Sequence, residues 1–276
     1  MSKRKHRKRH GFRNFLLFCF ILVGVWYVNT YTLKTTEVTI ESDKIKDDIT
    51  IVQITDLHGV TFGENNEYLL KKIKDIDPDF IVSTGDMYTY EDAAGEAIAL
   101  ELLSNLAKEY TVYSVNGEHD YDESFEEQLS LAGVDVLDYE MRKIHIGSTE
   151  IHLYGTTNVY YSQTFDLANA FAIDKSKFNL LIAHITNFEA FAGFGMDLSL
   201  CGDSHGGVIR LPYLGGLINR DQWLPEQKEG EVQYVKGLYE KENSKLFVSS
   251  GLGDYPVPIR FLNRPEVAVI QLKTVQ

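Results

Sequence analysis

The stretch Ile51-Val-Gln-Ile-Thr-Asp-Leu-His58 joins an apolar, β-branched run to a carboxylate and an imidazole. Such a run predicts a buried strand. Because alternate side chains of a strand lie on one face, Asp56 and His58 are expected to point the same way at the end of this strand. These two groups can bind a divalent metal ion, but Asp-x-His pairs also occur by chance. The interpretation therefore depends on how the other strands end.

Four later apolar runs end in the same kinds of side chain. The runs are 80–86, 111–120, 180–184 and 198–207, and their polar ends carry Asp86, Glu118, His119, Asp120, His184, Asp203 and His205. In open α/β sheets, ligands bind beyond the carboxyl ends of the strands. We therefore expect these side chains to converge at one edge of the fold.

The positions of the histidines support a metal site. Of the eight histidines, two lie in the basic N-terminal segment, and His145 and His152 lie in a predicted hairpin, where they read as ordinary sheet residues. The other four each follow a predicted strand next to Asp, Glu or Gly: His58, His119, His184 and His205. A single histidine of this kind is more often structural than a ligand. Four in equivalent positions favour a shared metal site.

The charge of the chain excludes some functions. The net charge is −13, but seven of the 27 Lys and Arg residues lie within residues 1–13. Residues 34–276 therefore carry 20 basic residues against 40 acidic ones, a net charge of about −20. Nucleic-acid binding needs basic surface, so no nucleic-acid partner is expected. A phosphorylated substrate would need bound metal to supply positive charge.

The N-terminal segment predicts a membrane anchor. Residues 1–13 form a basic head, residues 14–33 an apolar segment about long enough to cross a bilayer, and residues 34–276 one folded domain. A cleaved signal peptide is the alternative, but no Ala-x-Ala-like site follows, and Trp26, Tyr27 and Tyr31 suit the membrane interface. The positive-inside rule then predicts a single-pass protein with a cytoplasmic N-terminus and an extracytoplasmic domain.

Within residues 34–276, apolar strands alternate with helical patterns, which predicts an α/β domain with helices covering sheet faces. Residues 143–154 predict a hairpin that turns at Gly147-Ser148. Residues 206–223 are apolar for a loop and could line a substrate groove or touch a bilayer, with a buried loop as the alternative. Arg210 and Arg260 could bind a phosphate, although a surface ion pair is the more ordinary expectation.

The ordered motifs resemble the calcineurin-like metallophosphoesterase family. The matching stretches are Asp56-Leu-His58, Gly85-Asp86, Gly117-Glu-His119-Asp120, His184 and Gly202-Asp-Ser-His205-Gly-Gly. The C-terminal Gly251-Leu-Gly253, Pro256, Arg260 and Arg264-Pro-Glu266 resemble its membrane-anchored branch, which includes enzymes acting on phospholipid or UDP-diacylglucosamine head groups. The resemblance implies that residues 34–276 form a four-layer α/β/β/α sandwich of two mixed sheets, preceded by one transmembrane helix.

The resemblance also implies a role for each motif residue. Two divalent metal ions would be bound by Asp56, His58 and His205 at the first position and by Glu118, His184 and Asp203 at the second, with Asp86 bridging them. His119 would protonate the leaving oxygen or stabilise the transition state, and Asp120 would orient it. Two such ions, about 3.5–4 Å apart, share a hydroxide that attacks the phosphorus in line.

Two residues depart from the family pattern. Glu118 stands where the family usually has Asn, and Asp203 where it usually has His. Two added carboxylates favour hard cations, Mn²⁺ or Mg²⁺ above all, with Fe, Zn or Ca as alternatives. They also disfavour a dianionic monoester, so we expect hydrolysis of a phosphodiester or pyrophosphate bond in a lipid head group or nucleotide-linked substrate. The alternative is a non-catalytic metal- or ligand-binding relative that has lost hydrolysis.

Overall fold

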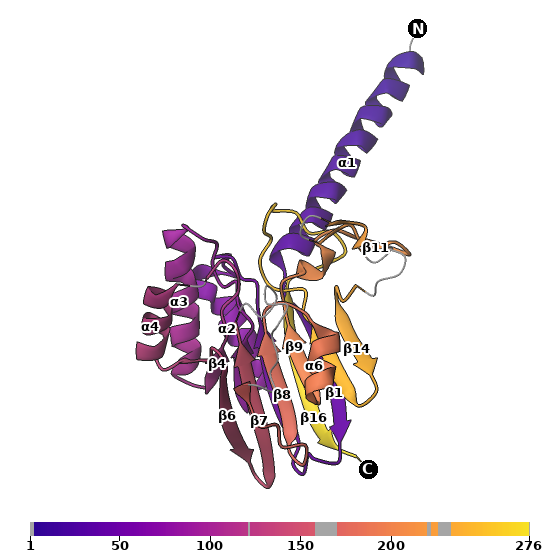
Figure 1. The fold of residues 1–276 in the computed structure, drawn as a ribbon. Helices are drawn as coiled ribbons and strands as arrows, with labels where there is room; N and C mark the ends of the chain where they lie inside the picture. Colours follow the sequence, from indigo (N-terminus) through magenta and orange to yellow (C-terminus); the bar gives the residue numbers. More distant parts are fainter. Residues whose placement is uncertain (1–2, 121, 158–169, 220–221, 226–232, 276) are drawn as a thin grey trace.

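Two six-stranded mixed sheets form the centre of the protein (Figure 1). The structure, a computed structural model, describes residues 3–120, 122–157, 170–219, 222–225 and 233–275. The first sheet has the order β1 (Lys34–Ser42), β16 (Glu266–Thr274), β2 (Ile49–Ile54), β3 (Phe80–Ser83), β4 (Val112–Ser114) and β5 (Asp135–Val136). The second has the order β14 (Gly237–Lys241), β15 (Ser244–Val248), β9 (Leu198–Cys201), β8 (Phe178–Ala183), β7 (Thr149–Thr156) and β6 (Glu140–Ile146).

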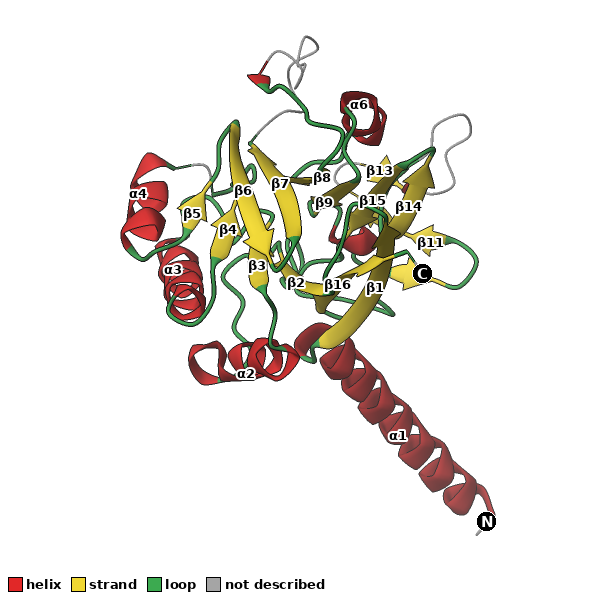
Figure 2. Ribbon diagram, turned by 90° about the horizontal axis from the view of Figure 1, so that it is seen from below, coloured by secondary structure: helices red, strands yellow, loops and turns green. Residues whose placement is uncertain are grey.

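Helices cover the outer face of each sheet (Figure 2). Helices α2 (Glu67–Ile76), α3 (Ala93–Ala107) and α4 (Glu123–Leu131) pack on the first sheet, and α6 (Phe188–Phe194) packs on the second. One apolar core lies between the two sheets, and two more lie between each sheet and its helices. This four-layer α/β/β/α arrangement confirms the fold class that the sequence predicts.

Strand β2 shows why the run of residues before Asp56 carries apolar side chains on both faces of the sheet. Ile49 and Ile51 face the core between the sheets, whereas Val52 and Ile54 face the core under the helices. A strand covered on both faces needs a nearly continuous apolar run, and β2 pairs in parallel with β3 as such strands do. This double burial fixes the register of the strand and therefore the direction in which the residues after it leave the sheet.

The predicted hairpin is confirmed, and one helix was not predicted. Strands β6 and β7 pair antiparallel, with Ile146 opposite Thr149 around the turn at Gly147-Ser148. Helix α6 begins at an Asn187 cap, whose side chain accepts a hydrogen bond from the backbone of Ala190. It has only seven residues. Its sequence, rich in Phe, Ala and Gly, carries too short a periodic pattern to predict a helix.

Short elements surround the carboxyl edge of the sheets. They are the 3₁₀ turns η1 (Glu64–Asn66) and η3 (His205–Gly207), the ribbon of β10 (Arg210–Leu211) with β11 (Gly215–Gly216), and the ribbon of β12 (Ile218–Asn219) with β13 (Gln222–Trp223). Strands β2, β3 and β4 are parallel to one another, as are β8 and β9. The residues that follow these strands are therefore brought to the same edge.

Helix α1 (Lys3–Tyr31) projects from this same edge of the molecule (Figure 1). Residues 11–31 are long and apolar enough to cross a membrane, and their apolar side chains are largely exposed. At 1.5 Å per residue, 21 residues span about 32 Å, close to the thickness of a bilayer's hydrocarbon core. One continuous helix thus joins residues 3–13 of the expected basic head to residues 14–31 of the expected anchor.

Candidate metal centre

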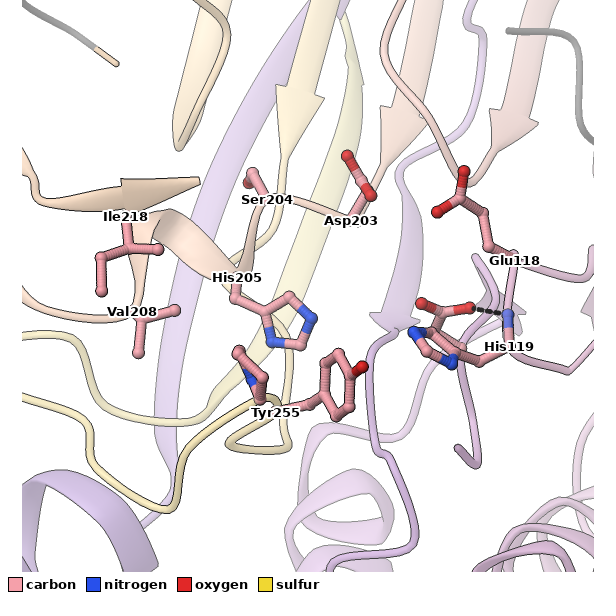
Figure 3. Close-up of a pocket in the computed structure, with 10 residues that line it drawn as sticks. Glu118, His119, Asp203, Ser204, His205, Val208, Ile218 and Tyr255 are labelled. Carbon is pink, nitrogen blue, oxygen red and sulfur yellow. Dashed lines mark hydrogen bonds between the residues drawn. The ribbon is translucent and has the colours of Figure 1, made fainter. Parts of the chain in front are cut away.

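The motif residues converge on a pocket of about 300 Å³ at the carboxyl edge of the sheets (Figure 3). Its polar lining includes Asp86, Glu118, His119, Asp203 and His205. The loops after β3, β4 and β9 supply these residues, which are up to 119 positions apart in the chain. The local sequence patterns predicted each of these residues at the end of a strand. The order of the strands in the sheets brings those ends together.

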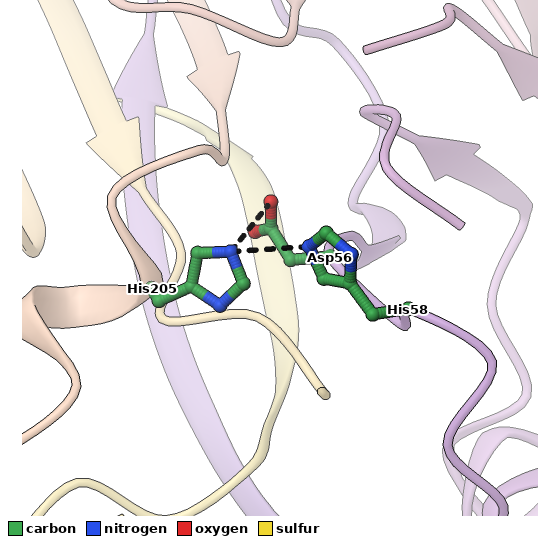
Figure 4. A group of neighbouring side chains, drawn as sticks. All are labelled: Asp56, His58 and His205. Carbon is green, nitrogen blue, oxygen red and sulfur yellow. Dashed lines mark hydrogen bonds and ion pairs between the residues drawn. The ribbon is translucent and has the colours of Figure 1, made fainter. Parts of the chain in front are cut away.

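The first cluster contains Asp56, His58 and His205 (Figure 4). The Nε2 atoms of His58 and His205 lie 3.2 Å apart, and His205 Nε2 lies 3.8 Å from Asp56 Oδ1. All three residues are buried, and ligand-type atoms from each lie within 4.8 Å of one another. Two imidazole nitrogens and a carboxylate at this spacing form a donor set suited to a divalent ion.

The second cluster contains Asp56, Asp86 and His184. His184 Nε2 lies 3.2 Å from Asp86 Oδ2, and the same oxygen lies 3.8 Å from His58 Nε2 in the first cluster. Asp86 therefore stands between the two histidine groups. A carboxylate in that position can serve two cations at once.

Contacts behind the clusters orient the histidine rings. His184 Nδ1 donates a hydrogen bond of 2.8 Å to the backbone carbonyl of Thr84, so its Nε2 lone pair faces the carboxylates. His58 Nδ1 lies 3.0 Å from the hydroxyl of Thr89. Metal-binding histidines usually use their second nitrogen in this way, which fixes the tautomer and the ring direction.

Burial and neighbouring carboxylates shift the pKa values of the buried groups at the site. Burial raises the pKa of Asp56 to about 7. Burial opposes the charged form of His184, but Asp86, Asp56 and Asp203 outweigh it and raise the pKa of His184 well above its ordinary value. Burial lowers the pKa of His58 to about 3. The three carboxylates thus favour a positive charge at the position of His184.

The buried polar atoms of the site fit a metal ion. Asp56 Oδ2 is buried and has no hydrogen-bond partner among the described residues, and His184 Nε2 faces two carboxylates, Asp86 at 3.2 Å and Asp203 at 3.8 Å. Leaving an atom such as Asp56 Oδ2 unpaired costs roughly 1–3 kcal/mol, and more for a charged group. Both atoms belong to the clusters, and their chemistry is that of metal ligands. The residues present therefore fit divalent cations.

The backbone at the site is held in an unusual conformation. Five of the motif residues have φ between +47° and +71°: Asp56, His58, Asp86, Asp203 and His205. Non-glycine residues rarely adopt these angles, and such strain concentrates at functional sites. Gly117 is required for a different reason, since a Cβ atom there would lie 2.1 Å from Asp86 Oδ1. The loops are thus shaped around the clustered side chains.

His119 and Asp120 follow β4 but have different surroundings. The His119 ring lines the pocket and could join His58 and Asp86 around a cation. The two oxygens of Asp120 accept backbone hydrogen bonds from Met87 and Gly117, each of 2.6 Å. These hydrogen bonds join the loops after β3 and β4 through the buried Asp120. The role that the resemblance implies for Asp120, orienting the His119 ring, stays a prediction.

Glu118 and Asp203 line the pocket, but the three tight clusters of described residues do not include them. Asp203 Oδ1 lies 3.8 Å from His184 Nε2, and the Asp203 backbone donates to Asp56 Oδ1 at 3.0 Å. Glu118 is exposed and lies across the pocket from Asp203 (Figure 3). Asp203 therefore lies beside the second cluster, whereas Glu118 lies on the solvent-exposed side of the pocket.

Tyr255 and Arg260 were not predicted in their observed roles. The Tyr255 ring stacks on His58 with 4.7 Å between ring centroids and also contacts His119 edge-on. The expectation of a surface ion pair at Arg260 is wrong, because this side chain is 1% exposed and donates to the carbonyls of Gly253, Ser250 and Asn263. No local pattern marks a lone tyrosine or arginine in a loop for either position.

Comparisons with known proteins agree with this geometry. The family model described as calcineurin-like phosphoesterase matches residues 49–237. The chain is 28% identical to the uncharacterized metallophosphoesterase YkuE of Bacillus subtilis, over 90% of this chain and 88% of that one. It is 27% identical to an uncharacterized metallophosphoesterase of Aquifex aeolicus, over 93% and 98% of the two chains. It is 26% identical to the phosphodiesterase YaeI of Escherichia coli, over 71% and 70%.

The family match covers more than half of the chain and includes all the strand ends that carry the two clusters. The relatives from Bacillus subtilis and Aquifex aeolicus match nearly the whole chain and carry the name metallophosphoesterase. The chain belongs to the calcineurin-like phosphoesterase family.

Proposed function

We propose that this protein is a membrane-anchored phosphoesterase that uses two divalent metal ions to hydrolyse a phosphodiester or pyrophosphate bond. The observation that carries the proposal is the position of Asp86. Its Oδ2 atom lies 3.2 Å from His184 and 3.8 Å from His58, so a single carboxylate joins two separate histidine groups.

In this proposal the first ion is held by Asp56, His58 and His205, and the second by His184 and Asp203, with Asp86 shared and Glu118 at the outer side. Two divalent ions would activate water and neutralise charge on the phosphoryl group. Carboxylate-rich sites favour hard cations, so Mn²⁺ or Mg²⁺ is the expected metal.

Other side chains of the pocket would act on the substrate directly. His119 reaches the pocket from the side opposite His205, where it can donate a proton to a leaving oxygen (Figure 3). Its backbone N–H donates to Asp86 Oδ1 at 2.9 Å, which holds the His119 loop against the metal-binding carboxylate. Val208, Ile218 and Tyr255 give the other wall an apolar character and limit access of water.

The charge of the site supports a diester or pyrophosphate over a monoester. Asp56, Asp86, Asp203 and Glu118 bring four carboxylates to one pocket region. A terminal phosphate carries a second negative charge that these groups repel, whereas a diester carries one.

A non-catalytic metal-binding protein is the second candidate. The observation that favours it is Glu118, which is exposed and lies outside the tight clusters. If the second ion is bound too weakly for turnover, the scaffold would bind one ion and would not hydrolyse substrate.

Anchoring by α1 completes the proposal. The basic head would lie in the cytoplasm, the apolar segment in the bilayer and the phosphoesterase domain outside the cytoplasm. The exposed apolar side chains of residues 11–31 support this arrangement, because exposing so many apolar groups to water is unfavourable.

The test uses the full chain in detergent. After treatment with a chelator, Mn²⁺, Mg²⁺, Ca²⁺ and Zn²⁺ are titrated separately while bound metal and hydrolysis of bis-p-nitrophenyl phosphate are measured. Two bound ions per chain with metal-dependent turnover, lost in Asp86→Ala, would support the enzyme. One bound ion or none, without turnover on diester, monoester or pyrophosphate, would support the binding protein.

A further inference from the structure

Exposed apolar side chains gather beside the mouth of the metal pocket. They come from two segments, residues 208–224 and 255–262, that also supply the apolar lining of the pocket. Tyr213 is fully exposed and Trp223 is 75% exposed. We call this surface the apolar rim, and its members are Tyr213, Leu214, Trp223, Leu224, Val257, Ile259 and Leu262.

The two segments are joined into one surface by backbone contacts. Ile209 bridges to Phe261, and the N–H of Arg210 donates to the carbonyl of Phe261 at 2.9 Å. Ile218, which lines the pocket, pairs with Trp223 across the short ribbon of β12 and β13. The rim is therefore continuous with the pocket wall.

The end of helix α1 is attached to the same surface. The indole N–H of Trp26 donates to the carbonyl of Pro258 at 3.1 Å, between the exposed Val257 and Ile259. The Arg264 side chain donates to the carbonyls of Thr32 and Leu33 at 3.2 and 2.9 Å. Figure 1 shows the yellow loop around the base of α1, next to β11. If α1 crosses a bilayer, this loop lies at the bilayer's surface.

The charge of the rim differs from that of the rest of the domain. The chain has 40 acidic residues, but none lies in residues 204–220 or 255–265. The charged residues in these segments are arginines, of which Arg260 is buried and Arg210 and Arg264 are partly exposed, and Asp221 is the one acidic residue in the sequence of residues 208–224. An anionic lipid surface would repel most faces of so acidic a protein, whereas this face offers apolar groups and the charges of Arg210 and Arg264.

We propose that the apolar rim docks on the surface of the bilayer that α1 crosses, so that the metal pocket opens toward lipid head groups. This inference rests on the membrane anchoring proposed above. Trp26 sets the depth, because a tryptophan at the end of a spanning helix lies in the interface, and Val257, Pro258 and Ile259 lie beside it. Tyr213 and Trp223 extend the contact across the mouth of the pocket.

Tryptophan fluorescence tests the docking directly. The chain has two tryptophans, and Trp26 stays in place because it contacts the docking loop, so the signal of Trp223 is obtained as the difference between the native chain and Trp223→Phe. Both full-length proteins are reconstituted into phosphatidylglycerol–phosphatidylcholine vesicles with or without brominated phosphatidylcholine, and iodide is added to the water. Docking predicts blue-shifted emission, strong quenching by the brominated lipid and little quenching by iodide. Red-shifted emission that iodide quenches and brominated lipid does not would overturn the proposal.

A matched reporter on another face serves as the control. Leu131 at the end of α4 is 83% exposed and lies away from α1 (Figure 1), so the emission that Leu131→Trp adds to the Trp223→Phe chain should be open to iodide. Quenching of both reporters by brominated lipid would mean nonspecific adsorption and would also overturn the proposal. Hydrolysis of bis-p-nitrophenyl phosphate in the same vesicles is measured separately. Its absence would contradict the proposed enzyme, while the fluorescence would still decide the docking.

Discussion

Asp86 Oδ2 lies 3.2 Å from His184 Nε2, and the other nitrogen of that ring is committed to the carbonyl of Thr84. The imidazole can therefore face Asp86 only with a proton or a metal ion at Nε2. Asp86 and His184 share an ion pair that lowers the pKa of Asp86 and raises that of His184, against the effect of burial on both. Metal binding must displace this proton.

Replacement of Asp86 by Asn is expected to remove metal-dependent turnover. The amide keeps the size of the side chain and can still accept the backbone hydrogen bond of His119, but it cannot supply a negative charge to two ions. Loss of several kcal/mol of metal-dependent stabilisation corresponds to about 10³-fold in rate. Activity and bound metal are measured together. The control Asp75→Asn changes an exposed carboxylate on α2 and should leave both unchanged.

Metal affinity is expected to fall as the pH is lowered below about 7. Asp56, whose pKa is raised to about 7, and His184, whose pKa is also raised, bind metal only after losing a proton. His58 does not limit binding, because burial already lowers its pKa to about 3. Between pH 8 and pH 6, Asp56 alone would weaken affinity about tenfold. Calorimetric titration with Mn²⁺ would detect this, and constant affinity over that range would contradict it.

Thr89→Val is expected to weaken metal binding without unfolding the protein. The hydroxyl of Thr89 lies 3.0 Å from His58 Nδ1 and helps to fix the direction of the ring. Loss of such an outer contact typically costs about 10–100-fold in metal affinity or activity. The measurements are metal affinity and turnover at saturating metal. Thr39→Val, on an exposed position of β1, provides the comparison, and equal behaviour of the two variants would argue against an orienting role for Thr89.

The double variant Glu118→Asn with Asp203→His tests whether these carboxylates set the specificity of the site. Removing two negative charges should shift metal preference toward Zn²⁺ and improve hydrolysis of p-nitrophenyl phosphate relative to its bis ester. We expect a change of about tenfold in that ratio, or 1.4 kcal/mol. An unchanged ratio and an unchanged order of metal affinities would show that neither carboxylate acts on substrate or metal.

Arg260→Met is expected to destabilise the loop that carries Tyr255. The variant removes the hydrogen-bond donor of three buried carbonyls, those of Gly253, Ser250 and Asn263. This should lower the free energy of unfolding by about 3 kcal/mol or more. For a domain of this size the midpoint of thermal unfolding should fall by roughly 6–12 °C. Arg142→Met, which removes a partly exposed ion pair, should change it by less than about 4 °C. Equal effects would contradict a special role for Arg260.

The sequence was sufficient to predict the strand ends because their signals are local. The run before Asp56 is apolar on both faces of β2, and the same pattern precedes Asp86 and His184. Burial on both faces fixes the register, and the next residues must then leave the sheet at its carboxyl edge. The α/β class and the gathering of the motif residues at one edge follow from this, whereas the four-layer sandwich was implied by the family resemblance.

Tertiary structure alone decided which atoms meet. The direction of the His184 ring depends on a carbonyl 100 residues away, and the burial of Arg260 depends on carbonyls that three loop residues present to it. The contact between Trp26 and Pro258 joins positions 232 residues apart. A sequence pattern reports the average environment of nearby residues, whereas these contacts depend on how separate elements pack. The sequence therefore determined the chemistry available at the edge of the sheets, and packing determined the site that it forms.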